Sequence, residues 1–245
     1  MKELLAALLH LIFPAPCRVC NLPLDAQRRS LICGRCWDQV RPVPEPFCPR
    51  CGKPFASPLA LEESPDHHCG ACRKQPPAFA VARAAALYEP GGTIRQAILL
   101  FKYGGRLSLG SHLGHLMAEA AGGLFEPREF DLLVPVPLHP SRARERGFNQ
   151  AAVLAKQVGS AWGHRVGYRL LRRIRATEAQ SGGRQAREEN VRGAFRVARP
   201  DQVEGRRLLL IDDVFTTGAT VNECARVLLA AGAAEVAVYT LARVE

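Results

Sequence analysis

The sequence predicts an α/β fold, in which a mainly parallel sheet is flanked by helices, preceded by a small cysteine-rich module. From about Pro77 onward, short apolar runs alternate with amphipathic segments, a pattern that indicates strands alternating with helices. Eight of the nine cysteines precede that point and lie between Cys17 and Cys72. A chain of 245 residues is long enough to bury a sizeable core and to form one or two domains.

The elements expected of the α/β part follow one another along the chain. Short apolar runs predict strands, and amphipathic segments predict helices. We expect strands at residues 81–88, 131–136, 166–171, 207–211 and 235–241, and helices at residues 93–101, 107–121, 149–161 and 220–231. In such a sheet, ligands bind beyond the carboxyl ends of the strands.

Residues 172–190, RRIRATEAQSGGRQAREEN, fit neither a strand nor a helix period. The segment is polar, contains two glycines and is rich in arginine. Long segments without secondary structure in a compact domain are usually functional or disordered. We therefore interpret this segment as an active-site lid.

Basic residues are concentrated in one part of the chain. The segment from Ser141 to Arg207 contains sixteen Arg and Lys residues against six Asp and Glu, which accounts for the net charge of +10. Such a concentration favours a polyanionic ligand, such as nucleic acid or a phosphorylated metabolite, or an acidic surface. Solvated helix faces are the alternative interpretation. The composition is ordinary and excludes disordered and fibrous classes.

The first residues predict a short helix and no membrane span. Residues 2–13, KELLAALLHLIF, are apolar but too short to cross a bilayer, and they lack the cleavage site of a signal peptide. We expect an N-terminal helix within residues 1–15 whose apolar face packs on the rest of the protein. The expected location is the cytoplasm.

The cysteines form four C-x-x-C pairs and predict two structural Zn²⁺ sites within residues 16–76. Two such turns can surround one Zn²⁺ with four thiolates, and separations of twelve and seventeen residues between pairs suit a zinc ribbon. A disulfide framework is the competing interpretation. Consecutive pairing gives cluster one (Cys17, Cys20, Cys33 and Cys36) and cluster two (Cys48, Cys51, Cys69 and Cys72).

Some alternatives stay open for the cysteines. The pairs could combine in crossed order, and His67 or His68 could replace a thiolate. A closed shell of four thiolates leaves no coordination position for chemistry, so the module is structural or a recognition surface. The ninth cysteine, Cys224, stands alone and is interpreted as a buried small residue.

Residues 208–220, LLLIDDVFTTGAT, carry the clearest functional signal. Four aliphatic residues suit a strand buried on both faces, which would place Asp212 and Asp213 at its carboxyl end. The following loop 216–220 leads into a helix, where backbone N–H groups and Thr hydroxyls can bind phosphate. Carboxylates beside an anion site suit a sugar phosphate, with the acids accepting hydrogen bonds from a diol. Neither a Walker motif nor G-x-G-x-x-G is present.

This stretch resembles the phosphoribosyl pyrophosphate (PRPP) signature of type I phosphoribosyltransferases. In combination with DLLVPVPL (131–138) and RGFNQ (146–150), the chain is similar to the ComF family. FKYGGR (101–106) and NVRGAF (190–195) match the same pattern. The resemblance covers nearly the whole chain, including a double zinc ribbon, and implies a type I phosphoribosyltransferase-like domain at residues 77–245.

The resemblance also implies roles for particular residues. Asp212 and Asp213 would hold the ribose hydroxyls, and residues 172–190 would form a hood that closes over PRPP. The tip of the pyrophosphate loop would be Leu138 and His139. The other residues implied to bind the sugar phosphate are Lys102, Val214, Thr216, Thr217, Gly218, Ala219 and Thr220. The candidate pyrophosphate contacts in the hood are Arg173, Arg175, Arg184 and Arg187, of which Arg184 and Arg187 are counted with the two acids as catalytic.

Several of the basic residues have simpler explanations. Lys102 and Arg106 could decorate a loop at the end of a helix rather than bind phosphate. Arg142, Arg144 and Arg146 could cap or solvate the next helix, or line a surface for a polyanion.

Two functions follow from the resemblance. The first is Mg²⁺-dependent transfer of the phosphoribosyl group from PRPP to an unidentified acceptor, with release of pyrophosphate. The alternative is a non-catalytic competence factor that responds to PRPP and binds single-stranded DNA or a partner, because the family is associated with DNA uptake during natural transformation. In either case the zinc ribbons could recruit proteins of the uptake machinery.

Overall fold

The computed structural model describes residues 15–24, 31–57, 67–103, 106–177 and 184–244. The N-terminal helix expected within residues 1–15 falls outside this part of the chain, apart from Ala15. So do Gly104 and Gly105 and residues 178–183 of the hood. Within the described ranges, no helix is both long and apolar enough to cross a membrane.

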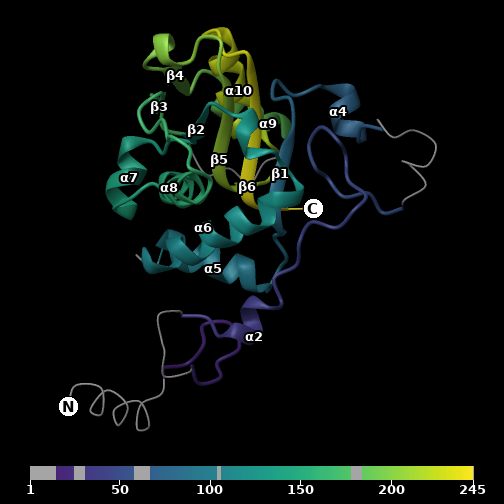
Figure 1. Cartoon of the computed structure of the whole chain (residues 1–245), viewed down its shortest axis with the longest axis vertical. Coiled ribbons are helices and arrows are strands. Elements are labelled where there is room, and N and C mark those ends of the chain that lie inside the picture. Colours follow the sequence, from purple (N-terminus) through teal and green to yellow (C-terminus); the bar gives the residue numbers. More distant parts are fainter. Residues whose placement is uncertain (1–14, 25–30, 58–66, 104–105, 178–183, 245) are drawn as a thin grey trace.

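A four-stranded parallel sheet forms the centre of the molecule (Figure 1). Its strand order is β1-β6-β5-β2, and every neighbouring pair runs parallel. The bounds are Ala82–Leu87 for β1, Leu132–Pro135 for β2, Arg207–Phe215 for β5 and Glu235–Arg243 for β6. The predicted α/β fold with a parallel sheet is therefore confirmed.

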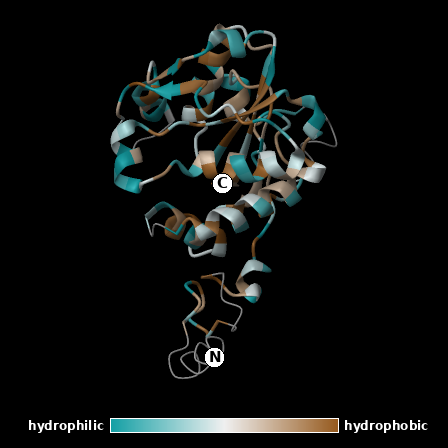
Figure 2. Ribbon diagram, turned by 60° about the vertical axis from the view of Figure 1, so that its left-hand side comes forward, coloured by the Kyte–Doolittle hydropathy of each residue, from teal (hydrophilic) through white to brown (hydrophobic). Residues whose placement is uncertain are grey.

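Helices cover both faces of the sheet. Successive residues of a strand point to opposite faces, so the apolar residues of one strand pack against both layers of helices. In β5, Leu209 and Ile211 pack with helices on one face, whereas Leu208 and Leu210 pack on the other. The first face is covered by α5 (Thr93–Tyr103), α6 (Ser108–Ala120) and α8 (Gln150–Trp162), and the second by α10 (Ala219–Ala230). Figure 2 shows the hydrophobic residues concentrated in the middle of this body.

The hood is more ordered than expected. Its described part contains helix α9 (Arg184–Val191), and the strands on either side, β3 (Leu171–Arg173) and β4 (Phe195–Val197), form a separate antiparallel pair. The prediction of an irregular segment was wrong there, because α9 is strongly polar and has too few apolar residues to indicate a helix by its pattern. The end of α9 is held by α10, where Glu223 accepts a hydrogen bond from the Gly193 N–H at 2.7 Å and pairs with Arg226.

Two other strand predictions need correction. Of residues 166–171, only Leu171 lies in a strand, because Val166 forms no more than an isolated bridge to Leu133. Strand β5 continues past residue 211 to Phe215 because it stays paired with β6, whereas its pairing with β2 ends at Ile211. Asp212 and Asp213 therefore lie inside β5 but beyond the end of β2.

Helix α7 (Pro140–Arg146) was not expected either, although its ends carry recognisable signals. His139 is the N-cap and accepts from the Ser141 N–H, and Pro140 occupies the first helical position. Gly147 ends the helix in the left-handed conformation with φ of 79°. Short 3-10 turns occupy Ala121–Gly123, Pro127–Glu129 and Pro200–Gln202.

The two cysteine modules differ in how they attach to the body. The first, with helix α2 (Gly34–Trp37), lies at the foot of the molecule, away from the sheet (Figures 1 and 2). The second, with helix α4 (Gly70–Lys74), lies beside β1, and the Ala82 N–H donates to the Arg50 carbonyl at 2.8 Å. All four cysteines of cluster two are buried in the same apolar core as the second face of the sheet.

Glycines on α6 allow close packing against α8. A Cβ at Gly110 would lie 2.5 Å from Val153 Cγ1, and one at Gly114 would overlap the Cβ of Gln157. Gly→Ala ordinarily stabilises a helix interior by up to about 1 kcal/mol. We expect Gly114→Ala instead to lower the free energy of unfolding by about 1–3 kcal/mol, because the two helices must move apart.

Urea unfolding measures this difference, and Gly122→Ala is the control, because a Cβ there meets nothing within 4 Å. A Gly114→Ala variant as stable as the wild type would contradict the packing described here.

Candidate functional site

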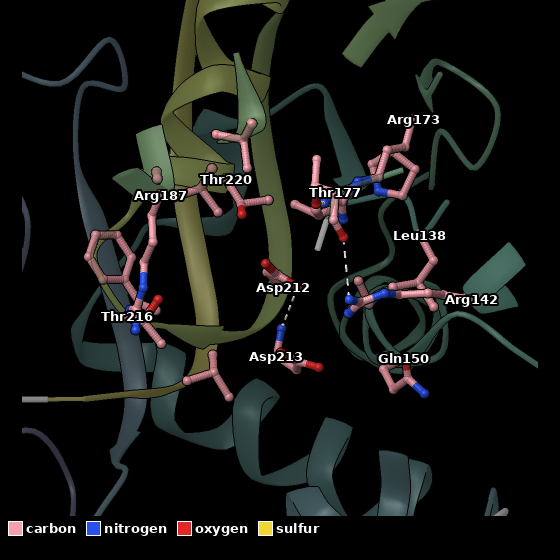
Figure 3. A pocket seen from close by; sticks show the side chains of 18 of the residues that line it. Leu138, Arg142, Gln150, Arg173, Thr177, Arg187, Asp212, Asp213, Thr216 and Thr220 are labelled. Carbon is pink, nitrogen blue, oxygen red and sulfur yellow. Dashed lines mark hydrogen bonds between the residues drawn. The ribbon is translucent and has the colours of Figure 1, made fainter. Parts of the chain in front are cut away.

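A cleft of about 400 Å³ opens beyond the end of β2, between the start of α10 and the hood. Figure 3 shows Asp212 and Asp213 in its middle, with Thr216 and Arg187 on one side and Arg142 on the other. Most of the residues that the sequence singled out line this cleft: Lys102, Leu138, Arg187, Asp212, Asp213, Val214, Thr216, Thr217, Gly218, Ala219 and Thr220.

Three of the predicted residues, His139, Arg175 and Arg184, are not among those lining the cleft. His139 is the N-cap of α7, where its Nδ1 lies 2.7 Å from the Ser141 hydroxyl. Arg184 begins α9, but its side chain lies outside the described part of the structure. Neither observation tests the role expected of these residues.

The two adjacent acids are held in different environments. The Asp213 carboxylate pairs with Lys102, with 2.9 Å between Oδ2 and Nζ, and both side chains are largely buried. The Asp213 backbone N–H donates to Asp212 Oδ1 at 2.8 Å. The Lys102 ammonium group thus neutralises Asp213, whereas Asp212 accepts a hydrogen bond from an uncharged backbone N–H.

This difference changes the proton affinity of Asp212. The pKa of its carboxyl group is raised to about 7, first by burial and then by the nearby negative charge of Asp213, whereas the Asp213 N–H and Lys102 act in the opposite direction. Near neutral pH the Asp212 carboxyl group is therefore protonated in a large fraction of the molecules.

Loop 216–220 has the geometry of an anion site at a helix start. Gly218 is the N-cap of α10 with φ of 80°, a conformation that favours glycine. A Cβ at this position would also lie 2.6 Å from the ring of Phe215. The loop therefore turns tightly into a twelve-residue helix, in which the Ala219 N–H donates to Thr217 Oγ1 at 3.4 Å and the N–H groups that follow can face an anion.

The opposite wall of the cleft is rich in cations. Arg142 donates to the Thr177 carbonyl at 3.4 Å, and Arg146 donates to Gln150 Oε1 at 3.2 Å. Arg173 lies over the ring of Phe195 at 5.3 Å. Arg142 and Arg146 both line the cleft, whereas Arg144 is exposed outside it.

Three buried donors on this wall have no partner among the described residues. They are the Nε groups of Arg146 and Arg173 and the Nε2 group of Gln150, which is 1% exposed. A buried donor without an acceptor costs about 1–3 kcal/mol, so such groups are usually completed by water or a ligand. The wall is therefore suited to a ligand rich in acceptor oxygens.

The sequence did not identify every residue of this wall. Gln150, Asn149 and Thr177 line the cleft but had no assigned role. Asn149 caps α8 and also donates to the Val136 carbonyl at 3.0 Å, which fixes the end of β2 to that helix. The RGFNQ motif was the available signal for the first two.

Arg175 contributes to the hood rather than to the cleft. It donates to the backbone carbonyls of Asn190 at 2.9 Å and Arg192 at 2.7 Å, and it does not line the cleft. Its side chain thus joins the two ends of the hood. In the described part of the hood, the cations that line the cleft are Arg173 and Arg187.

The eight paired cysteines form two compact clusters in consecutive order, and not in crossed order. In each cluster the four sulfur atoms lie within 4.8 Å of one another, and none forms a disulfide. Backbone N–H groups of Cys33 and Cys69 point at the sulfurs of Cys17 and Cys48, both at 3.3 Å. Such donors support thiolates, so the donor sets fit tetrahedral Zn²⁺.

The remaining candidates outside the clusters have structural roles. Neither His67 nor His68 joins a cluster, and His67 packs edge-on against Phe55 with ring centroids 5.6 Å apart. Cys224 is fully buried in α10, and burial raises the pKa of its thiol. It is therefore the small core residue that the sequence predicted.

Comparisons with known proteins agree with this geometry. Residues 8–76 match the double zinc ribbon domain family, and residues 144–245 match the phosphoribosyl transferase domain family. The class of protein is thus a phosphoribosyltransferase-type domain joined to a double zinc ribbon.

Similar full-length proteins define the family. The chain is 34% identical to the DNA utilization protein YhgH of Salmonella typhimurium, over 95% of this chain and 99% of that one. It is 30% identical to Competence protein F of Haemophilus influenzae, over 93% and 96%, and 26% identical to Competence protein ComFC of Bacillus subtilis, over 86% and 84%. The chain belongs to the ComF family.

Among solved structures, one similar protein is the glutamine PRPP amidotransferase from B. subtilis complexed with ADP and GMP. The TM-score is 0.40 with 21% identity, and the match covers 58% of this chain and 30% of that one.

Asp212 should make stability depend on pH. The folded chain holds the proton of this carboxyl with a pKa of about 7, against the ordinary value of 3.8. Between these values the folded state binds more protons than the unfolded state, so this contribution to stability is lost as the pH rises. We expect Asp212→Asn to flatten that loss and to unfold at higher urea concentration than the wild type at pH 8.

Urea titrations from pH 4 to pH 8 measure the effect. Asp201→Asn, which removes an exposed carboxylate and keeps both cysteine clusters, is the control. Equal pH dependence in the wild type and Asp212→Asn would contradict the environment described for this acid.

Proposed function

We propose that the protein binds PRPP and catalyses Mg²⁺-dependent transfer of its phosphoribosyl group to an acceptor, releasing pyrophosphate. The observation that carries this proposal is the division of the cleft. The paired acids lie between loop 216–220 on one side and, on the other, a wall of arginines in which some buried donors have no partner among the described residues. PRPP has the same order of groups, with a 5-phosphate, a ribose diol and a pyrophosphate.

In this arrangement each part of the ligand has a partner. Loop 216–220 would bind the 5-phosphate through backbone N–H groups and hydroxyls of its threonines. Asp213, with Asp212, would accept hydrogen bonds from the ribose hydroxyls. The pyrophosphate would then lie toward Arg142, Arg146 and Arg173, whose guanidinium groups suit bidentate binding of phosphate.

The same residues would favour the reaction. As the bond to pyrophosphate breaks, negative charge grows on the leaving group, and the fixed cations of the wall stabilise it. Arg184 and Arg187 of the hood would add positive charge and, with the hood, exclude water that would hydrolyse the activated sugar. Leu138 and His139 would shape the pyrophosphate loop.

The site also fits Mg²⁺, because carboxylate and phosphate oxygens are the ligands this ion takes. Asp212 and Asp213 would hold it directly or through water, and when bound it would neutralise the pyrophosphate. Lys102 already neutralises Asp213 at 2.9 Å, so its ammonium group would turn to the phosphates when the ion and the diol arrive. We place this activity in the cytoplasm.

Calorimetry with PRPP tests the proposal. We expect the wild type to bind PRPP in the presence of Mg²⁺ and Asp213→Asn to bind it about tenfold to a hundredfold more weakly, since a hydrogen bond to a charged group contributes about 1.5–3 kcal/mol. Release of pyrophosphate with panels of bases and amines then measures turnover.

Asp201→Asn is again the matched control and should bind PRPP as the wild type does. Absence of PRPP binding by the wild type with Mg²⁺ present would overturn the proposal.

A second candidate function is binding of single-stranded DNA, with PRPP as an effector. Relatives are named for competence and DNA utilization. Arg172 and Arg196 are exposed and lie directly opposite each other across β3 and β4, although like charges in such a pair repel. Close to Arg172 in the sequence, Tyr168 and Ile174 are more than half exposed. A cationic face with an exposed aromatic ring suits a phosphate backbone and stacked bases.

The double variant Arg172→Gln/Arg196→Gln tests this surface. Each phosphate contact to a single strand contributes about 0.7 to the slope of log affinity against log salt, so we expect the slope to fall by about 1.4. The control Arg73→Gln/Arg128→Gln makes the same change of charge elsewhere on the chain. It should bind single-stranded DNA more tightly than the first variant does. DNA binding that is absent at low salt, or equal in both variants, would rule out this face.

The zinc ribbons could also capture a protein of the DNA-uptake machinery, whichever of the two functions holds. Cluster one suits this role better than cluster two, because it lies away from the sheet and Cys20 is exposed.

A further inference from the structure

Cluster two is joined to loop 216–220 through one buried side chain. Arg243, the last residue of β6, is 4% exposed, and its Nη1 donates to the Cys51 carbonyl at 2.5 Å. Its guanidinium group lies over the ring of Phe215 at 4.9 Å. That ring packs under Gly218, so a continuous line of contacts runs from Cys51 to the loop.

The space behind the loop is partly empty. Between it and cluster two lies a cavity of about 140 Å³, whose walls include Cys69, Thr217 and Arg243. Phe79 packs edge-on against Phe215, with ring centroids 6.1 Å apart, and fixes that ring from another side. Movement of Arg243 would therefore reach the loop through Phe215.

Zinc would hold Arg243 in place in two ways. It fixes the turn from Cys48 to Cys51, and so the carbonyl to which Arg243 donates. A Zn²⁺ ion with four thiolates also has a net charge of 2−, which compensates the buried guanidinium. Loss of the ion would therefore release the turn whose carbonyl holds Arg243.

We propose that Arg243 is a positioning residue that makes the shape of loop 216–220 depend on zinc at cluster two. The inference deepens the proposed function and rests on it where it concerns the 5-phosphate. Cluster two then belongs to the sugar phosphate site, whereas cluster one does not.

The test uses the full chain and three readouts. These are binding of ribose 5-phosphate, binding of magnesium pyrophosphate, and hydrogen exchange at the amides of loop 216–220. For Arg243→Met we expect about tenfold weaker binding of ribose 5-phosphate, binding of pyrophosphate unchanged within about twofold, and faster exchange in the loop. Both zinc ions should remain bound.

Arg83 offers a matched control. It is another partly buried arginine of a neighbouring strand, it donates to the Pro49 carbonyl in the same module at 3.0 Å, and it lies over Phe47 at 4.8 Å. It does not contact Phe215 in any described interaction. Arg83→Met should therefore leave binding of ribose 5-phosphate and loop exchange unchanged.

Two further variants separate positioning from folding. Phe215→Leu removes the ring but keeps the bond to Cys51, and it should reproduce the effects of Arg243→Met. Cys72→Ser should lose one zinc ion and weaken ribose 5-phosphate binding by about tenfold, whereas Cys20→Ser should lose one zinc ion without that effect.

Three results would overturn the proposal. They are wild-type loop exchange in Arg243→Met, equal effects of Arg243→Met and Arg83→Met, and a loss of pyrophosphate binding as large as that of ribose 5-phosphate. If the wild type binds no ribose 5-phosphate but Arg243→Met still loosens the loop, the proposed function fails and the positioning role stands.

Discussion

The structure depends on the unequal lengths of two neighbouring strands. Strand β5 pairs with β6 up to Phe215, but β2 ends opposite Ile211. Beyond Ile211, β5 remains paired with β6 along one edge, and its other edge faces the cleft. Asp212 and Asp213 occupy this half-paired stretch, so their carboxylates are fixed by the sheet yet accessible. Asn149 secures the shorter strand through its bond to Val136, which keeps the gap open.

The charged residues of the cleft form one close ion pair within the described residues, between Lys102 and Asp213. A ligand would have to compete with that pair, but not with others of its kind. Asp212 gains a proton near neutrality, and Asp213 already has its cation. Within the described residues, the arginines of the opposite wall form few hydrogen bonds to carboxylates. They contact carbonyls, aromatic rings and an amide instead. This leaves their positive charge to attract an anion, at a cost in stability that local packing must offset.

The sequence predicted the parallel sheet, both cysteine clusters and most residues of the cleft, because aliphatic runs, C-x-x-C spacing and the LLLIDDVFTTGAT stretch each reflect a local physical requirement. It did not predict α9, whose polar residues show no period and which depends on contacts such as that between Glu223 and Gly193. Nor did it predict the end of β5, which is set by pairing with β6. Gln150 lies in the wall because of tertiary contacts, which the spacing of residues along the sequence does not predict.

The bond from Glu223 to Gly193 also has a mechanical consequence. Helix α10 supplies loop 216–220 at its first turn and, one turn later, a carboxylate that fastens the end of α9 at 2.7 Å. One end of the hood is therefore attached to the same helix that begins at loop 216–220. The far wall, near Arg142 and Thr177, has no such bond to α10 among the described residues.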